Sequence, residues 1–206
     1  MKRIMIVAAM TLLWLAGRAD SPLTSTDIAS AYDDCEMVQY AIQLQNGENN
    51  ELRTSILYWL SDAEAPVDER IAVVNKLGWN FDGKISGDQL EEYLMRRHKL
   101  DKAADLASKL DAETLIVLAY TKAMSNYFNV TDAAELGHKA LEKNKNKSFT
   151  VAFISALIDA QIWLDSDWNM VYNVVAKALT DDTLHRDMRQ AAVDSVMEYI
   201  NLYEKY

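Results

Sequence analysis

The fold is decided by two stretches, TLIVLAYTKAM at residues 114–124 and FTVAFISALIDAQIWL at residues 149–164. Each would be apolar on nearly every side of a helix, and a helix of that kind belongs at the centre of a core. Polar residues (Ser155, Asp159 and Gln161) interrupt the second stretch. We therefore interpret it as a core helix and not as a membrane span.

The helical period extends from this centre over almost the whole chain. Only six Gly and two Pro residues are present among 206, which leaves few signals for β-hairpins. We expect an all-α fold of about nine helices in antiparallel pairs, arranged as an irregular bundle or a short right-handed solenoid. The segments with this period are residues 28–45, 51–62, 66–77, 87–97, 101–109, 112–128, 131–144, 149–164, 168–179 and 184–204.

Short side chains that accept hydrogen bonds are favoured at helix N-termini. They occur where helices are expected to begin, at Asp111, Thr131, Ser148, Asp167 and Asp182. We predict that these five residues are N-caps.

The sequence contains a faint internal repeat. The segment AADLASKL (103–110) is similar to AAELGHKAL (133–141). Small residues at such spacing let helices approach closely, as in helical repeat proteins. The segment 112–144 resembles a tetratricopeptide unit in Ala133 and Ala140, its two small second-helix positions. Three positions depart from that pattern, namely Thr121, Gly137 and Lys145. Generic antiparallel packing explains the same residues, so both interpretations stay open.

The N-terminus has the features of a cleavable signal peptide. A basic pair (Lys2 and Arg3) precedes an apolar run at residues 4–15, which is too short to span a membrane. We therefore expect residues 1–19 to be removed on export and a single helical domain over residues 20–206. The expected location is periplasmic or secreted, and an uncleaved membrane anchor is the alternative.

The chain is acidic, with a formal net charge of −10 at neutral pH. This charge repels nucleic-acid phosphates and anionic membrane surfaces. We therefore expect no nucleic-acid partner and no membrane association after signal cleavage. The lone cysteine, Cys35, cannot form an internal disulfide and is interpreted as a small packed side chain, with an intermolecular bridge as the alternative.

The stretch NFDGKISGDQ, which begins at Asn80, resembles an EF-hand loop over residues 78–89. With Gly83 at the loop's glycine position, the best side-chain ligands for calcium would be Asn80, Asp82 and Ser86. These three are the candidate metal ligands.

The first and last ligand positions of that loop are Gly78 and Gln89, where calcium needs carboxylates. We therefore predict very weak or absent calcium binding and favour a structural interpretation. Gly78 would end a helix, Gly83 would occupy the left-handed position of a turn, and Ser86 with Gln89 would form a capping box.

The sequence contains no recognised catalytic or nucleotide-binding motif, and we expect no cofactor. The histidines (His98, His138 and His185) lack the spacing of a zinc site. Aromatic residues recur at helical spacing near the C-terminus, and we predict that they belong to the core, with a peptide- or glycan-binding face as the alternative. They are Trp168, Tyr172, Tyr199, Tyr203 and Tyr206.

Four phrases together resemble small exported helical proteins encoded by gut Bacteroidetes: LGWNFDGK, YTKAMSNYFNV, ISALIDAQ and DMRQAAVDSVMEYINLY. The resemblance covers most of the chain after the signal-like segment. It implies export and a helical fold, and it transfers no catalytic or binding residue, because that group has no assigned function.

These observations favour an exported helical-repeat module that binds a protein or peptide partner. One alternative is a weakly calcium-responsive helical protein that acts through residues 78–89. The other is an exported hydrolase that uses two carboxylates remote in sequence, although we lean against enzymatic activity.

Overall fold

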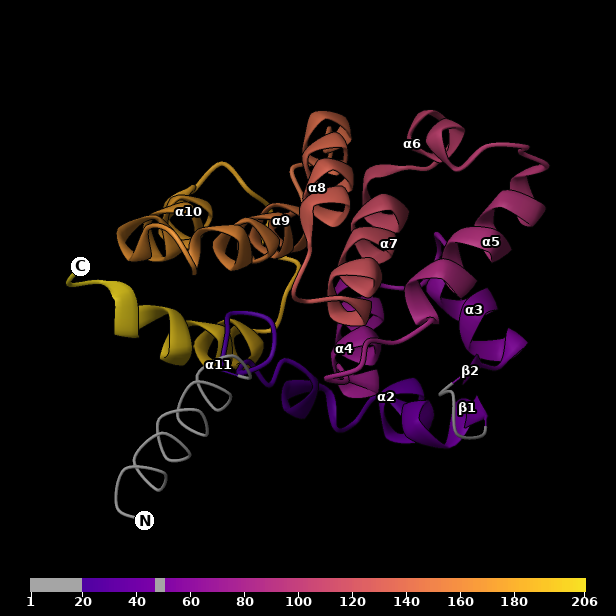
Figure 1. The fold of residues 1–206 in the computed structure, drawn as a ribbon, viewed down its shortest axis with the longest axis horizontal. Coiled ribbons are helices and arrows are strands. Elements are labelled where there is room, and N and C mark those ends of the chain that lie inside the picture. Colours follow the sequence, from indigo (N-terminus) through magenta and orange to yellow (C-terminus); the bar gives the residue numbers. More distant parts are fainter. Residues whose placement is uncertain (1–19, 47–50) are drawn as a thin grey trace, which may run out of the picture.

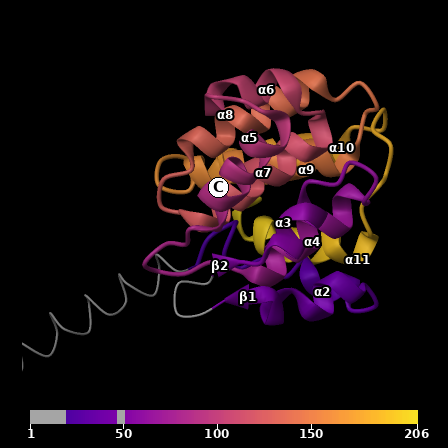
Figure 2. The ribbon, with the colours of Figure 1, turned by 90° about the vertical axis from the view of Figure 1, so that its right-hand side faces the viewer.

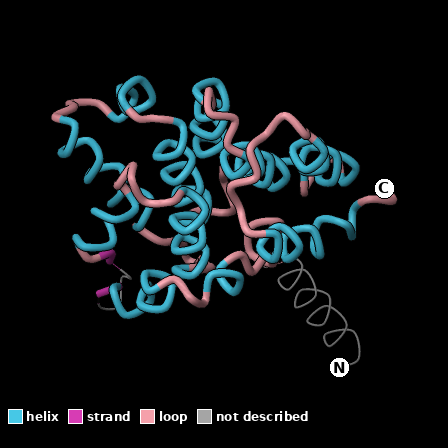
Figure 3. The backbone as a smooth tube through the Cα atoms, turned by 180° about the vertical axis from the view of Figure 1, so that it is seen from behind, coloured by secondary structure: helices cyan, strands magenta, loops and turns pink. Residues whose placement is uncertain are grey.

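The computed structural model describes residues 20–46 and 51–206, and this part of the chain is all-α, as predicted. It contains ten α-helices in which sequence neighbours pack as antiparallel pairs (Figures 1 and 3). The expected signal peptide, residues 1–19, lies outside the described residues.

The α-helices are α2 (Glu36–Tyr40), α3 (Thr54–Leu60), α4 (Val67–Leu77), α5 (Ser86–His98), α6 (Leu106–Lys109), α7 (Ala112–Ser125), α8 (Thr131–Lys143), α9 (Phe149–Trp163), α10 (Trp168–Thr180) and α11 (Gln190–Ile200). Short 3-10 helices are η1 (Ala29–Tyr32), η2 (Ala41–Leu44), η3 (Ala103–Asp105) and η4 (Asn201–Tyr203). Strands β1 (Gln45–Asn46) and β2 (Glu51–Leu52) pair antiparallel. The predicted helix over residues 51–62 therefore begins later, at α3.

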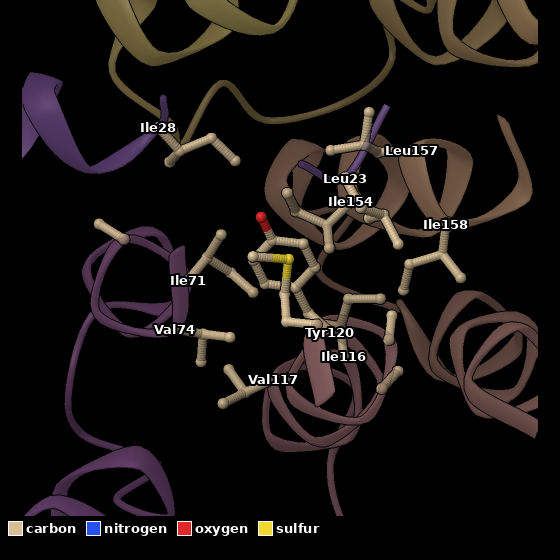
Figure 4. Close-up of a cluster of buried hydrophobic side chains, with 14 of the residues drawn as sticks. Leu23, Ile28, Ile71, Val74, Ile116, Val117, Tyr120, Ile154, Leu157 and Ile158 are labelled. Carbon is tan, nitrogen blue, oxygen red and sulfur yellow. The ribbon is translucent and has the colours of Figure 1, made fainter. Parts of the chain in front are cut away.

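The two apolar stretches form the central helices, as predicted. α7 contacts α4, α5, α8 and α9, and all of residues 114–121 are buried. Side chains of α4, α7 and α9 converge on one cluster, which Leu23 and Ile28 join from the N-terminal segment (Figure 4). Burial of this apolar surface is the main source of stability.

The helices form a closed arrangement and not the open row of a solenoid. α7, α8, α9 and α10 contact one another in succession, in the manner of a helical repeat. α11 then packs against η1 near the start of the chain. In the end-on view, α6 lies at one side of the molecule, whereas α2 and the β-hairpin lie at the other (Figure 2). The arrangement is thus an irregular bundle.

Residues 28–45 do not form the single helix that was predicted. Arg189, just before α11, donates a hydrogen bond from Nη1 to the carbonyl of Ala31 (3.0 Å) and pairs with Asp34. Its guanidinium also lies over the Tyr32 ring, 4.4 Å from the centroid. These contacts hold a bend between η1 and α2, so a distant residue overrides the local helical pattern.

Three of the five predicted N-caps are confirmed. The side chains of Asp111, Ser148 and Asp167 accept hydrogen bonds from main-chain N–H groups in the first turns of α7, α9 and α10. Thr131 is instead the first residue of α8 and makes no capping bond. Asp182 is not a cap, because the segment before α11 is extended where it pairs with the chain before α9.

Candidate functional site

A hollow of about 950 Å³ lies between the α4–α5 loop and the α7–α8 loop. The starts of α5 and α8 and the end of α7 complete its walls. A second hollow, of about 510 Å³, shares four of its lining residues with the first: Phe81, Tyr127, Phe128 and Asn129. The two hollows therefore adjoin, and together they are named the aromatic cleft.

Four aromatic rings form a row at this cleft. Trp79 meets Tyr127 edge-on, with 5.0 Å between ring centroids, and Tyr127 lies 4.2 Å from Phe128. Phe128 meets Phe81 at 5.5 Å with an angle of 87° between the ring planes. Tyr127 is buried, whereas Phe81 is 50% exposed and Phe128 is 48% exposed. From the buried Tyr127 the row therefore leads to the surface at Phe128 and Phe81.

The hydroxyl of Tyr127 is buried and has no hydrogen-bond partner among the described residues. Burial raises the pKa of this hydroxyl, so it stays protonated at neutral pH. A buried polar group without a partner costs about 1–3 kcal/mol. Within the described part of the chain, the Tyr127 hydroxyl is therefore an unsatisfied polar group of the interior.

Ser125, the last residue of α7, joins the two loops. Its carbonyl accepts from the main-chain N–H of Lys84 (2.9 Å), and its Oγ accepts from the N–H of Gly87 (2.9 Å). The same hydroxyl donates to the carbonyl of Thr121 (2.7 Å), which leaves the Ser86 hydroxyl as its donor at 2.9 Å. These bonds fix one wall of the cleft against the other.

The capping box predicted at Ser86 and Gln89 is therefore wrong. Ser86 is the first residue of α5, and its hydroxyl is directed at Ser125. The side-chain oxygen of Gln89 accepts instead from the N–H of Leu52 in β2 (2.9 Å). The N-terminal cap of α5 is Ser125, which lies 38 positions after Gly87 in the sequence. No local sequence pattern indicates a cap from so far away.

The two glycine predictions in this loop are confirmed. Gly78 follows α4 with a φ of +67°. Gly83 has a φ of +81° and donates its N–H to the carbonyl of Asn80 (2.9 Å), which closes a turn. Both are left-handed conformations that favour glycine.

The three candidate calcium ligands do not converge. Asn80 and Asp82 line the cleft, but the Asn80 side-chain oxygen accepts from the N–H of Asp82 (3.3 Å). Ser86 is buried and its hydroxyl is turned toward Ser125. Within residues 20–46 and 51–206, no group of three or more His, Cys, Asp or Glu side chains is placed to hold a metal ion.

A lysine ammonium occupies the interior of the loop. Lys84 Nζ donates to the carbonyls of Leu77 (2.5 Å) and Gly78 (3.3 Å), the last acceptors of α4. A cation at a helix C-terminus complements the helix dipole. Burial lowers the pKa of Lys84 from 10.5 to about 8, because the charged form loses its hydration.

The charges of the cleft are not balanced. Lys122 lies 3.0 Å from a Glu91 oxygen and 3.5 Å from an Asp88 oxygen, so its charge is compensated. Lys84, the other lysine of the cleft, donates to the carbonyls of Leu77 and Gly78 at the end of α4. Asp82 and Asp132 are exposed lining residues, and no cation of the described chain pairs with either. The cleft is therefore negative.

The three histidines are dispersed, and among the described residues only His138 has a charged partner. Its Nε2 lies 2.8 Å from an Asp159 oxygen at the surface between α8 and α9. Burial raises the pKa of Asp159. This contact ties two helices together and is a structural pair.

The C-terminal aromatic residues only partly belong to the core. Tyr199 is buried, as predicted, and shares a hydroxyl–hydroxyl bond of 2.8 Å with Tyr203. Trp168 and Tyr206 are 49% and 61% exposed and meet each other edge-on. The prediction of a core role is therefore wrong for these two: Trp168 begins α10 and Tyr206 follows η4.

A small hollow of about 260 Å³ brings together Asp68, Glu113 and Asp187. Burial raises the pKa of Asp68 and of Glu113. Each of the three already has a partner, namely the Tyr32 hydroxyl, the Arg70 guanidinium and Thr150, respectively. These three carboxylates, of the kind that a hydrolase would need, are thus engaged in contacts that hold the fold.

Comparison of the chain with protein-family models, with curated proteins and with solved structures finds no match. The resemblance to exported Bacteroidetes proteins therefore stays a prediction. In the part of the chain that the structure describes, no helix has the length and apolar character needed to cross a membrane.

Proposed function

We propose that the protein is a binding module that holds a short, extended segment of a protein partner in the aromatic cleft. The observation that carries this proposal is the pair of half-exposed rings, Phe81 and Phe128, which belong to both hollows. Exposed apolar groups beside a hollow are typical of interaction sites, and aromatic residues dominate the binding energy of many interfaces.

The dimensions and the rigidity of the cleft support the same function. Ligand sites usually enclose about 300–1,000 Å³, and the two hollows measure about 950 and 510 Å³. Ser125 pins the two loops to each other, so little ordering is needed when a ligand binds. A preorganised site of this kind loses less conformational entropy on binding.

The sequence supports the proposed setting. A signal-like N-terminus favours a periplasmic or secreted protein, and the acidic composition disfavours nucleic acid as the partner. Helical repeats commonly use their loops and faces for protein recognition. A protein segment is therefore the ligand class that fits composition and cleft together.

The proposal is tested by selection from a random peptide library displayed on phage, with the purified protein as bait. Peptides recovered from the selection are synthesised, and their affinities are measured by calorimetry. A variant that carries Phe81→Ser and Phe128→Ser should bind them at least about tenfold more weakly, since hot-spot side chains contribute 2 kcal/mol or more.

A matched control carries Tyr40→Ser and Ile42→Ser, two side chains that are 45% and 51% exposed and lie outside the cleft. This control should bind like the wild type. Thermal unfolding of all variants verifies that they are folded. Equal binding to the wild type and to the Phe81/Phe128 variant would contradict the proposal.

A further inference from the structure

We infer that the segment held in the aromatic cleft is basic, and that a Lys or Arg side chain of the ligand enters the first hollow beside Asp82, Asp132 and the exposed rings. This inference rests on the proposed function and names the chemistry of its ligand. Two features of the cleft support it.

The first feature is the unbalanced charge. Both lysines of the cleft are already engaged, Lys122 by two carboxylates and Lys84 by main-chain carbonyls. The carboxylates of Asp82 and Asp132 line the hollow without a cation from the described residues. A cationic ligand group compensates them, whereas an acidic segment would be repelled.

The second feature is that no cation of the described residues covers either of the two exposed rings. Elsewhere the molecule covers aromatic faces with guanidinium groups: Arg186 lies 4.3 Å from the Phe149 centroid and Arg97 lies 5.4 Å from that of Tyr58. No cation of residues 20–46 or 51–206 lies over Phe81 or Phe128. A cation above an aromatic face is stabilised by the ring quadrupole.

The charge of the whole chain acts in the same direction as the charge of the cleft. The net charge of −10 adds long-range attraction for a basic ligand.

The test uses the peptides recovered from the displayed library. Their sequences should be enriched in Lys or Arg next to an apolar residue. Replacing the Arg by citrulline, or acetylating the Lys, keeps the shape of the side chain and removes its charge. Each change should weaken binding about tenfold at low salt and less at high salt, because screening reduces the charge contribution.

The protein side is tested with a variant that carries Asp82→Asn and Asp132→Asn. It should lose about tenfold in affinity for the charged peptide and show little change for the citrulline peptide. A matched control, Glu64→Gln with Glu198→Gln, removes the same total charge from exposed positions outside the cleft. It should change affinity by less than about twofold.

The two proposals fail in different ways. If neutral peptides are selected, or if the citrulline peptide binds as well as the arginine peptide while loss of the two rings still abolishes binding, the basic ligand is wrong and the peptide site stands. If no selected peptide needs Phe81 and Phe128 for its binding, the proposed function is wrong, and the inference of a basic ligand is wrong as well.

Discussion

Two helix crossings in this molecule use the same pair of residue types. α5 meets α7 at Gly87 and Ser125, and α8 meets α9 at Gly137 and Ser155. A Cβ added to Gly87 would lie 2.9 Å from the main-chain Cα of Lys122, whereas a Cβ added to Gly137 would lie 2.9 Å from the Ser155 hydroxyl. The first obstacle is backbone and the second is a side-chain atom.

The two hydroxyls also differ. Ser125 Oγ accepts from the N–H of Gly87 and donates to the carbonyl of Thr121, so it caps α5 while it packs. Ser155 Oγ is buried without a partner among the described residues. One crossing therefore combines close packing with a cap, and the other is close packing alone. The following predictions, from the largest expected effect to the smallest, test this difference.

Gly87→Ala should destabilise the protein by about 2–3 kcal/mol, because the new methyl group meets α7 backbone that cannot move aside. The better helix propensity of alanine offsets at most about 1 kcal/mol of this. Urea unfolding followed by circular dichroism measures the change. An unaltered unfolding midpoint would mean that α5 and α7 slide apart more easily than their contact implies.

Ser125→Ala should cost about 2 kcal/mol, because it leaves the N–H of Gly87 and the hydroxyl of Ser86 without their buried partner. Hydrogen exchange at the Gly87 amide should accelerate with it. Ser108→Ala, which removes an exposed hydroxyl bonded to the Asp105 carbonyl, is the control. Comparable losses in both variants would refute a capping role for Ser125.

Ser155→Ala should stabilise the protein by about 1 kcal/mol, since it removes a buried hydroxyl that has no partner. The measurement is the free energy of unfolding in urea. This is the opposite sign from Ser125→Ala at the equivalent place in the other crossing. A loss of stability would show that the Ser155 hydroxyl has an unseen partner, such as buried water.

Gly137→Ala should have a small effect whose sign depends on Ser155. In the Ser155→Ala background the nearest side-chain atom left for the new methyl group is a Cβ at 3.6 Å, so the substitution should stabilise by about 0.5 kcal/mol through helix propensity. In the wild type it should be less favourable. A double-mutant cycle measures this coupling, and additive effects would contradict direct contact between the two positions.

The last prediction concerns the dependence of stability on alkaline pH, through Lys84 beside the first crossing. The folded pKa of Lys84 is about 8, below its unfolded value of 10.5. Between these pH values the unfolded state binds more protons, so the free energy of unfolding should rise with pH. Lys84→Met should lack this rise, whereas Lys76→Met, at an exposed position, should keep it. Equal slopes in both variants would contradict the assignment.

Much of the fold could be predicted because its signals are local. The apolar stretches around α7 and α9, the stop at Gly78 and the caps at Asp111, Ser148 and Asp167 depend on residues within a turn or two. The errors arise where a distant residue intervenes. Arg189 bends the chain at Asp34, a contact 155 residues apart, and no periodicity could indicate it.

The sequence indicated only one of the two loops that form the candidate cleft. The loop that contains Asn80 and Asp82 resembles a calcium site in its sequence. The partner loop, with Phe128, and the start of α8, with Asp132, carried no motif. The one usable signal was the aromatic pair in the phrase YFNV, which follows a buried helix directly. Pairing that phrase with the first loop required the contacts of Ser125, which are long-range.

The position of Ser125 also bears on the order in which the molecule forms. The residues of the α4–α5 loop and of α5 precede α7 in the chain, yet the cap of α5 and the acceptor for Lys84 N–H both belong to the last residue of α7. Before α7 is in place, the first turn of α5 lacks this cap and the loop lacks the bond from the Lys84 N–H. A contact across 38 residues closes a longer loop than any turn within a helix, so the aromatic cleft should form after α7 itself.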